Sequence, residues 1–165
     1  MRIELTADLA APREAVWASI ARPGSWTGLI HGLTRFDHAG GPAAGLGARY
    51  RMRMRVGSAD VGGLIEMVEW DEGGEIAWTS VLGIGQRGRW RLRDAGPGAT
   101  RVTLRFAYQS PGLLGWVADR VAAPVVRRNL DAGLDELRRR AAKEAARPRR
   151  RRRRPAAHTT TTTTR

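Results

Sequence analysis

Residues 48–56 read A-R-Y-R-M-R-M-R-V, with arginine at every second position. Side chains of a β-strand alternate between its two faces, so this period of two predicts a strand with one packed face and one solvated face. Tyr50, Met52 and Met54 belong to the packed face, and the arginines belong to the solvated one. The segment is therefore expected to lie in an antiparallel sheet whose outer side carries arginine.

The same alternation returns in residues 87–93 and 101–108. Arginine or threonine again occupies every second position from Arg87 to Arg93 and from Arg101 to Arg105, and mostly apolar side chains occupy the positions between. Three such strands predict one sheet with a guanidinium-rich outer face and an inner face of aromatic and aliphatic residues. The inner-face positions of the two later strands are Gly88, Trp90, Leu92, Val102, Leu104, Phe106 and Tyr108.

The remaining periodicities give an order of elements around these strands. Residues 2–9 read as a strand, and two short helices are expected near residues 11–20 and 25–33. A meander of six strands follows between residues 33 and 108, because the connections are short and rich in glycine. Apolar residues at helical spacing predict one long helix over residues 113–143, with Pro124 expected to kink or split it.

Length and composition favour a single domain over residues 1–146 and a disordered Arg/Thr-rich tail over residues 147–165. The chain has no cysteine, which excludes disulfides and thiol chemistry. Neither an apolar signal-peptide core nor a run of about 18 apolar residues is present, so a cytoplasmic location is expected.

The net charge of +13 is unevenly distributed. Arg147, Arg149–Arg154 and Arg165 carry eight of the 29 basic charges, and no acidic residue lies among them. The preceding residues therefore carry a net charge of only +5. The basic tail is expected to bind polyanions such as RNA, or an anionic surface, weakly and in a salt-dependent way.

Several short motifs, in this order and spacing, resemble the START-related superfamily known as SRPBCC, in particular its bacterial polyketide cyclase/dehydrase and lipid-transport proteins. The likeness covers roughly residues 1–145. The residues that carry it are APREAVW at 11–17, Trp26, GLGARY at 45–50, WRL at 90–92, GATRV at 98–102, LLG at 113–115, Leu134 and Leu137.

This resemblance implies a helix-grip fold of class α+β, in which a seven-stranded antiparallel sheet wraps around a long C-terminal helix and leaves a cavity between them. The inner-face composition agrees, because large apolar side chains typically line such pockets. Gly83, Gly85 and Gly88 are expected to leave room for a ligand. The predicted lining residues are Tyr50, Met52, Met54, Trp78, Trp90, Phe106, Tyr108, Val117 and Val121.

Catalytic candidates are few. His31 follows the second helix and is interpreted either as an acid or base at the cavity mouth or, preferably, as a surface residue. Glu66 and Glu69 lie in a strand of ambiguous parity, so either one faces inward, or they pair with arginines on the outer face. Ser80 and Gln86 are possible polar contacts. No ligand spacing for a metal is visible, and no cofactor is expected.

Three functions are compatible with this sequence. The first is binding of a hydrophobic or amphipathic small molecule, such as a lipid, a polyketide or an aromatic metabolite. The second is a polyketide cyclase or dehydratase, which requires placed acid and base groups. The third is an interaction module that uses Arg149–Arg154. A monomer or a homodimer is expected.

Overall fold

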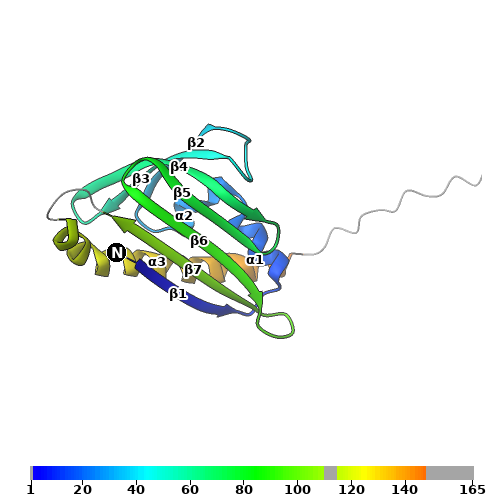
Figure 1. Ribbon diagram of the computed structural model, residues 1–165. Helices are drawn as coiled ribbons and strands as arrows, with labels where there is room; N and C mark the ends of the chain where they lie inside the picture. The colour runs from blue at the N-terminus through cyan, green and yellow to red at the C-terminus, as the bar shows by residue number, and fades with distance from the viewer. Residues whose placement is uncertain (1, 110–114, 148–165) are drawn as a thin grey trace, which may run out of the picture.

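The computed structural model describes residues 2–109 and 115–147, and the side chains of residues 2–108 and 123–147 (Figure 1). Seven antiparallel strands form one sheet in the order β1-β7-β6-β5-β4-β3-β2. The predicted α+β class and helix-grip fold are confirmed. The elements are β1 (Arg2–Leu9), α1 (Arg13–Ile20), a 3-10 turn (Pro23–Ser25), α2 (Trp26–Leu29), β2 (Leu33–Gly40), β3 (Arg49–Val56), β4 (Ala59–Asp71), β5 (Glu75–Gly83), β6 (Gly85–Asp94), β7 (Thr100–Gln109) and α3 (Gly115–Ala145).

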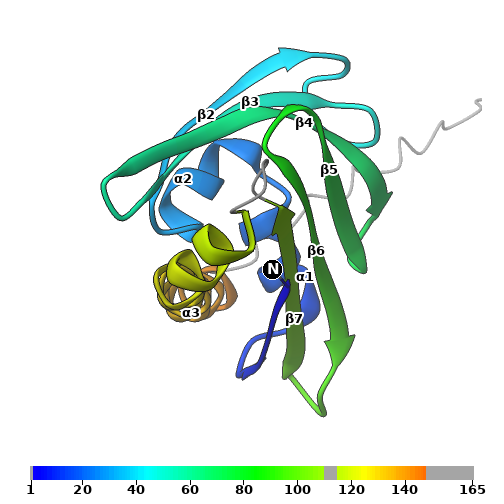
Figure 2. The same cartoon turned by 60° about the vertical axis from the view of Figure 1, so that its left-hand side comes forward.

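The sheet curls over the three helices, which all lie on its concave side (Figure 2). Helix α3 turns an apolar stripe toward the sheet, with the spacing that an amphipathic helix requires. Pro124 lies inside α3, and one helix continues on both sides of it, so the predicted split does not occur. The buried stripe consists of Val126, Leu130, Leu134, Leu137 and Ala141.

The convex face of the sheet carries arginines that pair with acidic residues on neighbouring strands. These exposed pairs contribute little to stability individually, since water screens them. They show that the alternating arginines form a solvated outer face, as predicted from the period of two. The pairs include Arg49–Glu66 at 2.7 Å, Arg89–Glu69 at 2.8 Å, Arg101–Asp8 at 2.7 Å and Arg105–Glu4 at 2.8 Å.

Glu75 is the exception on this face because its carboxylate is buried. Its side chain is 6% exposed, and it contacts Arg89 and accepts a hydrogen bond of 2.8 Å from Nε of Arg91. Burial acts to raise the pKa of Glu75, but the hydrogen bond from Arg91 and the charges of Arg89, Arg91 and Arg93 outweigh it, so that the pKa is lowered. The folded protein therefore favours the ionised carboxylate.

We expect the substitution Glu75→Gln to lower the free energy of unfolding by about 1–3 kcal/mol at pH 7, the usual range for losing a charged hydrogen-bond partner. Because the folded pKa is the lower one, this contribution is complete above the unfolded pKa of about 4.3 and is lost as the pH falls through the folded pKa. Urea unfolding of both proteins between pH 3 and pH 7 measures this. The control is Asp8→Asn, because Asp8 forms an exposed ion pair with Arg101. Its loss should have a much smaller effect on the free energy of unfolding. A Glu75→Gln difference that is independent of pH would contradict the assignment.

Candidate functional site

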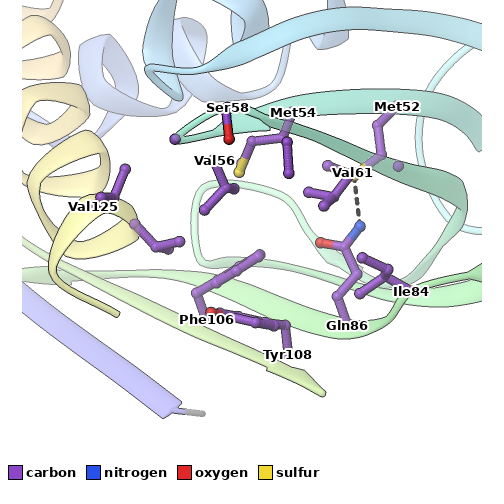
Figure 3. Close-up of a pocket in the computed structure, with 14 residues that line it drawn as sticks. Met52, Met54, Val56, Ser58, Val61, Ile84, Gln86, Phe106, Tyr108 and Val125 are labelled. Carbon is purple, nitrogen blue, oxygen red and sulfur yellow. Dashed lines mark hydrogen bonds between the residues drawn. The ribbon is translucent and has the colours of Figure 1, made fainter. Parts of the chain in front are cut away.

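A cavity of about 390 Å³ lies between the sheet and α3 (Figure 3). Its walls come from the β3–β4 hairpin, the start of β6, the end of β7 and α3. The exposed turn at Gly57 and Ser58 lies at its edge. Typical ligand pockets have about 300–1,000 Å³, so this volume is sufficient for a small ligand. The lining residues are Met52, Met54, Val56, Gly57, Ser58, Ala59, Val61, Gly62, Ile84, Gln86, Phe106, Tyr108, Val125 and Val126.

Aromatic side chains fill the space nearer to α2. Tyr50 stacks on Phe36 with ring centroids 4.7 Å apart, and Phe36 stacks on Trp26 at 5.1 Å. Trp26 contacts Trp78 edge-to-face at 4.9 Å. Such ring pairs add to the stability that burial provides. The concave face of the sheet is therefore divided into a packed aromatic core at one end and a cavity at the other.

Most of the cavity wall is apolar. Its polar side chains among the described residues are Ser58, Gln86 and Tyr108. The Gln86 side-chain amide donates a hydrogen bond of 2.7 Å to the Met52 sulfur, drawn as the dashed line in Figure 3. The backbone N–H of Gln86 donates to the hydroxyl of Ser80 at 3.0 Å. A mostly apolar wall with these few polar groups suits a ligand that is mainly apolar.

Some of the residues predicted to line a cavity do so, and others form the core. Met52, Met54, Phe106 and Tyr108 line it. The side chains of Val117 and Val121 lie outside the described residues. Three predicted residues are buried in the core and do not line this cavity: Tyr50, Trp78 and Trp90.

Two of these core residues, Tyr50 and Trp90, carry a polar atom whose hydrogen bonding is described. The hydroxyl of Tyr50 donates a hydrogen bond of 2.8 Å to the backbone oxygen of Ala43, and burial raises the pKa of Tyr50. The indole N–H of Trp90 is buried and has no hydrogen-bond partner among the described residues. Neither side chain is among those that line the cavity.

The prediction that Gly88 leaves room for a ligand is wrong. A Cβ atom at Gly88 would overlap with the indole ring of Trp78, which occupies that space. Gly85 differs, because a Cβ atom there would meet no atom within 4 Å. The small residues of β6 thus have different roles, and only Gly85 has open space beside it.

A β-bulge in β4 places both candidate carboxylates on the outer face. Met67 pairs with Trp78 and Glu69 pairs with Ala77, so that Val68 is the extra residue. A bulge of this kind shifts the alternation by one position. Glu66 and Glu69 therefore both point outward, where they pair with Arg49 and Arg89, and neither lines the cavity.

The structure does not bring His31 together with these carboxylates. His31 is exposed, is absent from the cavity wall and follows α2. No group of three or more His, Cys, Asp or Glu side chains within residues 2–108 and 123–147 is arranged to hold a metal ion. In the described part of the chain, no helix is both long and apolar enough to cross a membrane.

Sequence reasoning missed part of the cavity wall. Val56 shares the packed face that the alternation predicts for Met52 and Met54, but it was not among the predicted lining residues. Ile84 and Ala59 lie at strand ends, where periodicity gives no signal. Val125 and Val126 lie on α3, and which of its residues face the cavity depends on how the helix packs against the sheet.

Comparison with known proteins places the chain in a family. The model of the family described as "polyketide cyclase / dehydrase and lipid transport" matches residues 1–142. Among curated proteins, none matches the sequence significantly.

Solved structures with this fold are numerous, and three illustrate its range. TTHA0849 from Thermus thermophilus has a TM-score of 0.75 and 19% identity, covering 88% of this chain and 100% of its own. The Zhui aromatase/cyclase from Streptomyces has a TM-score of 0.72 and 19% identity, covering 87% and 94%. Norcoclaurine synthase from Thalictrum flavum, in complex with dopamine and hydroxybenzaldehyde, has a TM-score of 0.64 and 12% identity, covering 89% of both chains.

These structural likenesses show the fold, whereas the family match extends over most of the sequence. The motifs between residues 11 and 137 that carry the resemblance lie within the matched region. The chain therefore belongs to the polyketide cyclase/dehydrase and lipid transport family of the SRPBCC superfamily.

Proposed function

We propose that this protein binds a hydrophobic or amphipathic small molecule in the cavity between the sheet and α3. The observation that carries the proposal is the cavity of about 390 Å³, whose described lining includes no charged side chain. Burial of apolar ligand surface there supplies the binding free energy, at roughly 25 cal/mol per Å². Members of the ligand class include lipids, polyketides and aromatic metabolites.

A titration with the neutral dye Nile red tests this proposal. We expect saturable binding at one dye per chain, displaced by some members of a panel of fatty acids, quinones and aromatic polyketides. Dye that does not bind in a saturable way, together with a panel that gives no signal by calorimetry, would contradict the proposal.

A cyclase or dehydratase activity is less well supported by the geometry. Such chemistry uses a group that donates or accepts a proton within hydrogen-bond reach of the ligand. Tyr108 is the one titratable side chain among the described residues that line the cavity. His31, Glu66 and Glu69 lie elsewhere. The ligand-binding proposal therefore does not depend on catalysis, and any acid–base role is assigned first to Tyr108.

The basic tail supports a second proposal, contact with a polyanion. We expect replacement of Arg149–Arg154 by serine to flatten the dependence of log K on log salt for single-stranded RNA. Each lost phosphate contact contributes a slope of about 0.7. Fluorescence anisotropy between 50 and 300 mM salt measures the slope, and thermal unfolding checks that the domain is unchanged. An equal slope in both proteins would assign RNA contact to the arginines of the sheet.

A cytoplasmic location and a monomeric or homodimeric state stay predictions.

A further inference from the structure

We propose that the ligand carries an uncharged hydroxyl or carbonyl group that hydrogen-bonds to the side-chain amide of Gln86. This inference rests on the proposed function and specifies the chemical class of the ligand. Its basis is the position and incomplete hydrogen bonding of Gln86 in an otherwise mostly apolar wall.

The local strand pairing holds Gln86 at the cavity. The ladder between β5 and β6 ends at the pair Thr79–Arg87, so β6 pairs only with β7 from Gln86 toward its start. Gln86 lies directly opposite Tyr108 on β7, and both side chains line the cavity. The backbone N–H of Gln86 therefore has no ladder partner on β5, and it donates a hydrogen bond of 3.0 Å to the hydroxyl of Ser80 instead. The backbone of Gln86 is thus fixed without using its side chain.

The side-chain amide of Gln86 is buried but only partly satisfied. The residue is 8% exposed. Its Nε2 donates to the Met52 sulfur, which is a weak acceptor. Its Oε1 accepts no hydrogen bond from a described residue. This oxygen is not among the fully buried atoms, and the residue lines the cavity, so a ligand can reach it. A carboxamide has two donors and one acceptor with two lone pairs, so most of its hydrogen-bonding capacity is unused.

A ligand hydroxyl or carbonyl would complete these hydrogen bonds. A pure hydrocarbon would instead cover the amide and leave it unsatisfied, which is unfavourable. Figure 3 shows the oxygen of Gln86 directed toward the space between Val56, Val61 and Phe106. The group that binds Gln86 is therefore surrounded by the apolar body of the same ligand.

The charged groups among the described residues disfavour an ionised head group at this point. The described lining contains no Arg, Lys or His side chain. A carboxylate or phosphate moved there would lose its hydration without gaining a counter-charge from any described lining residue, which is costly. Arg53 and Arg55, although on the same strand as Met52 and Met54, point to the opposite face of the sheet.

Three probes of equal ring size separate these effects: 2-naphthol, 2-methylnaphthalene and 2-naphthoate, titrated at pH 7 into the full chain and into Gln86→Leu. We expect the ratio of methylnaphthalene Kd to naphthol Kd to fall about 3- to 10-fold in Gln86→Leu, the value of one hydrogen bond. Methylnaphthalene should bind the variant at least as tightly as it binds the wild type. Naphthoate should bind the wild type at least about tenfold more weakly than naphthol.

The variant Gln86→Met, which keeps the length of the side chain, provides a second test if Gln86→Leu folds poorly. An unchanged ratio in a folded variant, or naphthoate as the tightest ligand, would overturn this inference while leaving the cavity as a binding site. Failure of all three probes to bind the wild type, together with failure of the Nile red titration, would overturn the proposed function itself. The two failures are therefore distinguishable.

Discussion

Gly88→Ala is expected to lower the free energy of unfolding by about 1–3 kcal/mol, the usual cost of overpacking a filled core. The added Cβ atom would overlap with the indole of Trp78, which is 2% exposed. That ring cannot move aside easily, because Trp26 contacts it at 4.9 Å and stacks in turn on Phe36. The substitution therefore strains the aromatic core as a whole.

Gly85→Ala is the matched control on the same strand. A Cβ atom at Gly85 would meet no atom within 4 Å, so we expect its urea midpoint to equal or slightly exceed that of the wild type. Urea unfolding followed by tryptophan fluorescence measures both variants. Equal midpoints for the two alanine variants would mean that Trp78 does not occupy the space beside Gly88.

Val61→Trp is expected to leave the fold intact and to weaken ligand binding by at least about tenfold. Val61 is half-buried on β4, pairs with Met54 and lines the cavity. An indole at this position extends into the open space instead of displacing a packed residue. Loss of about 60 Å² of ligand contact costs roughly 1.5 kcal/mol, which is about tenfold in Kd.

Val68→Trp adds the same volume to the outer face of the same strand. Val68 is 48% exposed, so its replacement should leave ligand affinity unchanged. Displacement of Nile red, measured for both variants, separates filling of the cavity from a general effect of tryptophan. Equal loss of binding in both variants would place the ligand outside the cavity.

The overall fold was predictable because its strands alternate strictly. With arginine at every second position of residues 48–56, only one register buries Tyr50, Met52 and Met54, and all three are buried. The apolar stripe of α3 was equally regular. Order of elements and resemblance to a family then sufficed to predict a helix-grip fold.

The parity of β4 could not be predicted in the same way. Residues 64–70 read L-I-E-M-V-E-W, so both parities present apolar side chains. The bulge at Val68 lets Ile65, Met67 and Trp70 all face inward while both glutamates face outward. It is a property of the pairing between β4 and β5, and no glycine or turn residue marks it locally.

The division of the inner face into core and cavity also depended on tertiary contacts. Trp78 and Met54 both belong to inner faces of strands, and nothing local distinguishes their surroundings. Trp78 is enclosed because Trp26 from α2 and Gly88 from β6 meet it. Met54 lies where the sheet and α3 leave space. Side-chain type predicts an apolar interior, but the positions of α2 and α3 decide which part of it is empty.

Native mass spectrometry of the full chain tests the occupancy of the cavity most directly. The protein is purified from a bacterial host without detergent and compared with a denatured aliquot and with Val61→Trp. We predict that the native wild type carries an apolar species of defined mass, absent from the denatured spectrum and depleted in the variant. A native wild-type spectrum without added mass, from a protein that also binds neither Nile red nor any panel ligand, would contradict the proposal that the cavity binds a ligand.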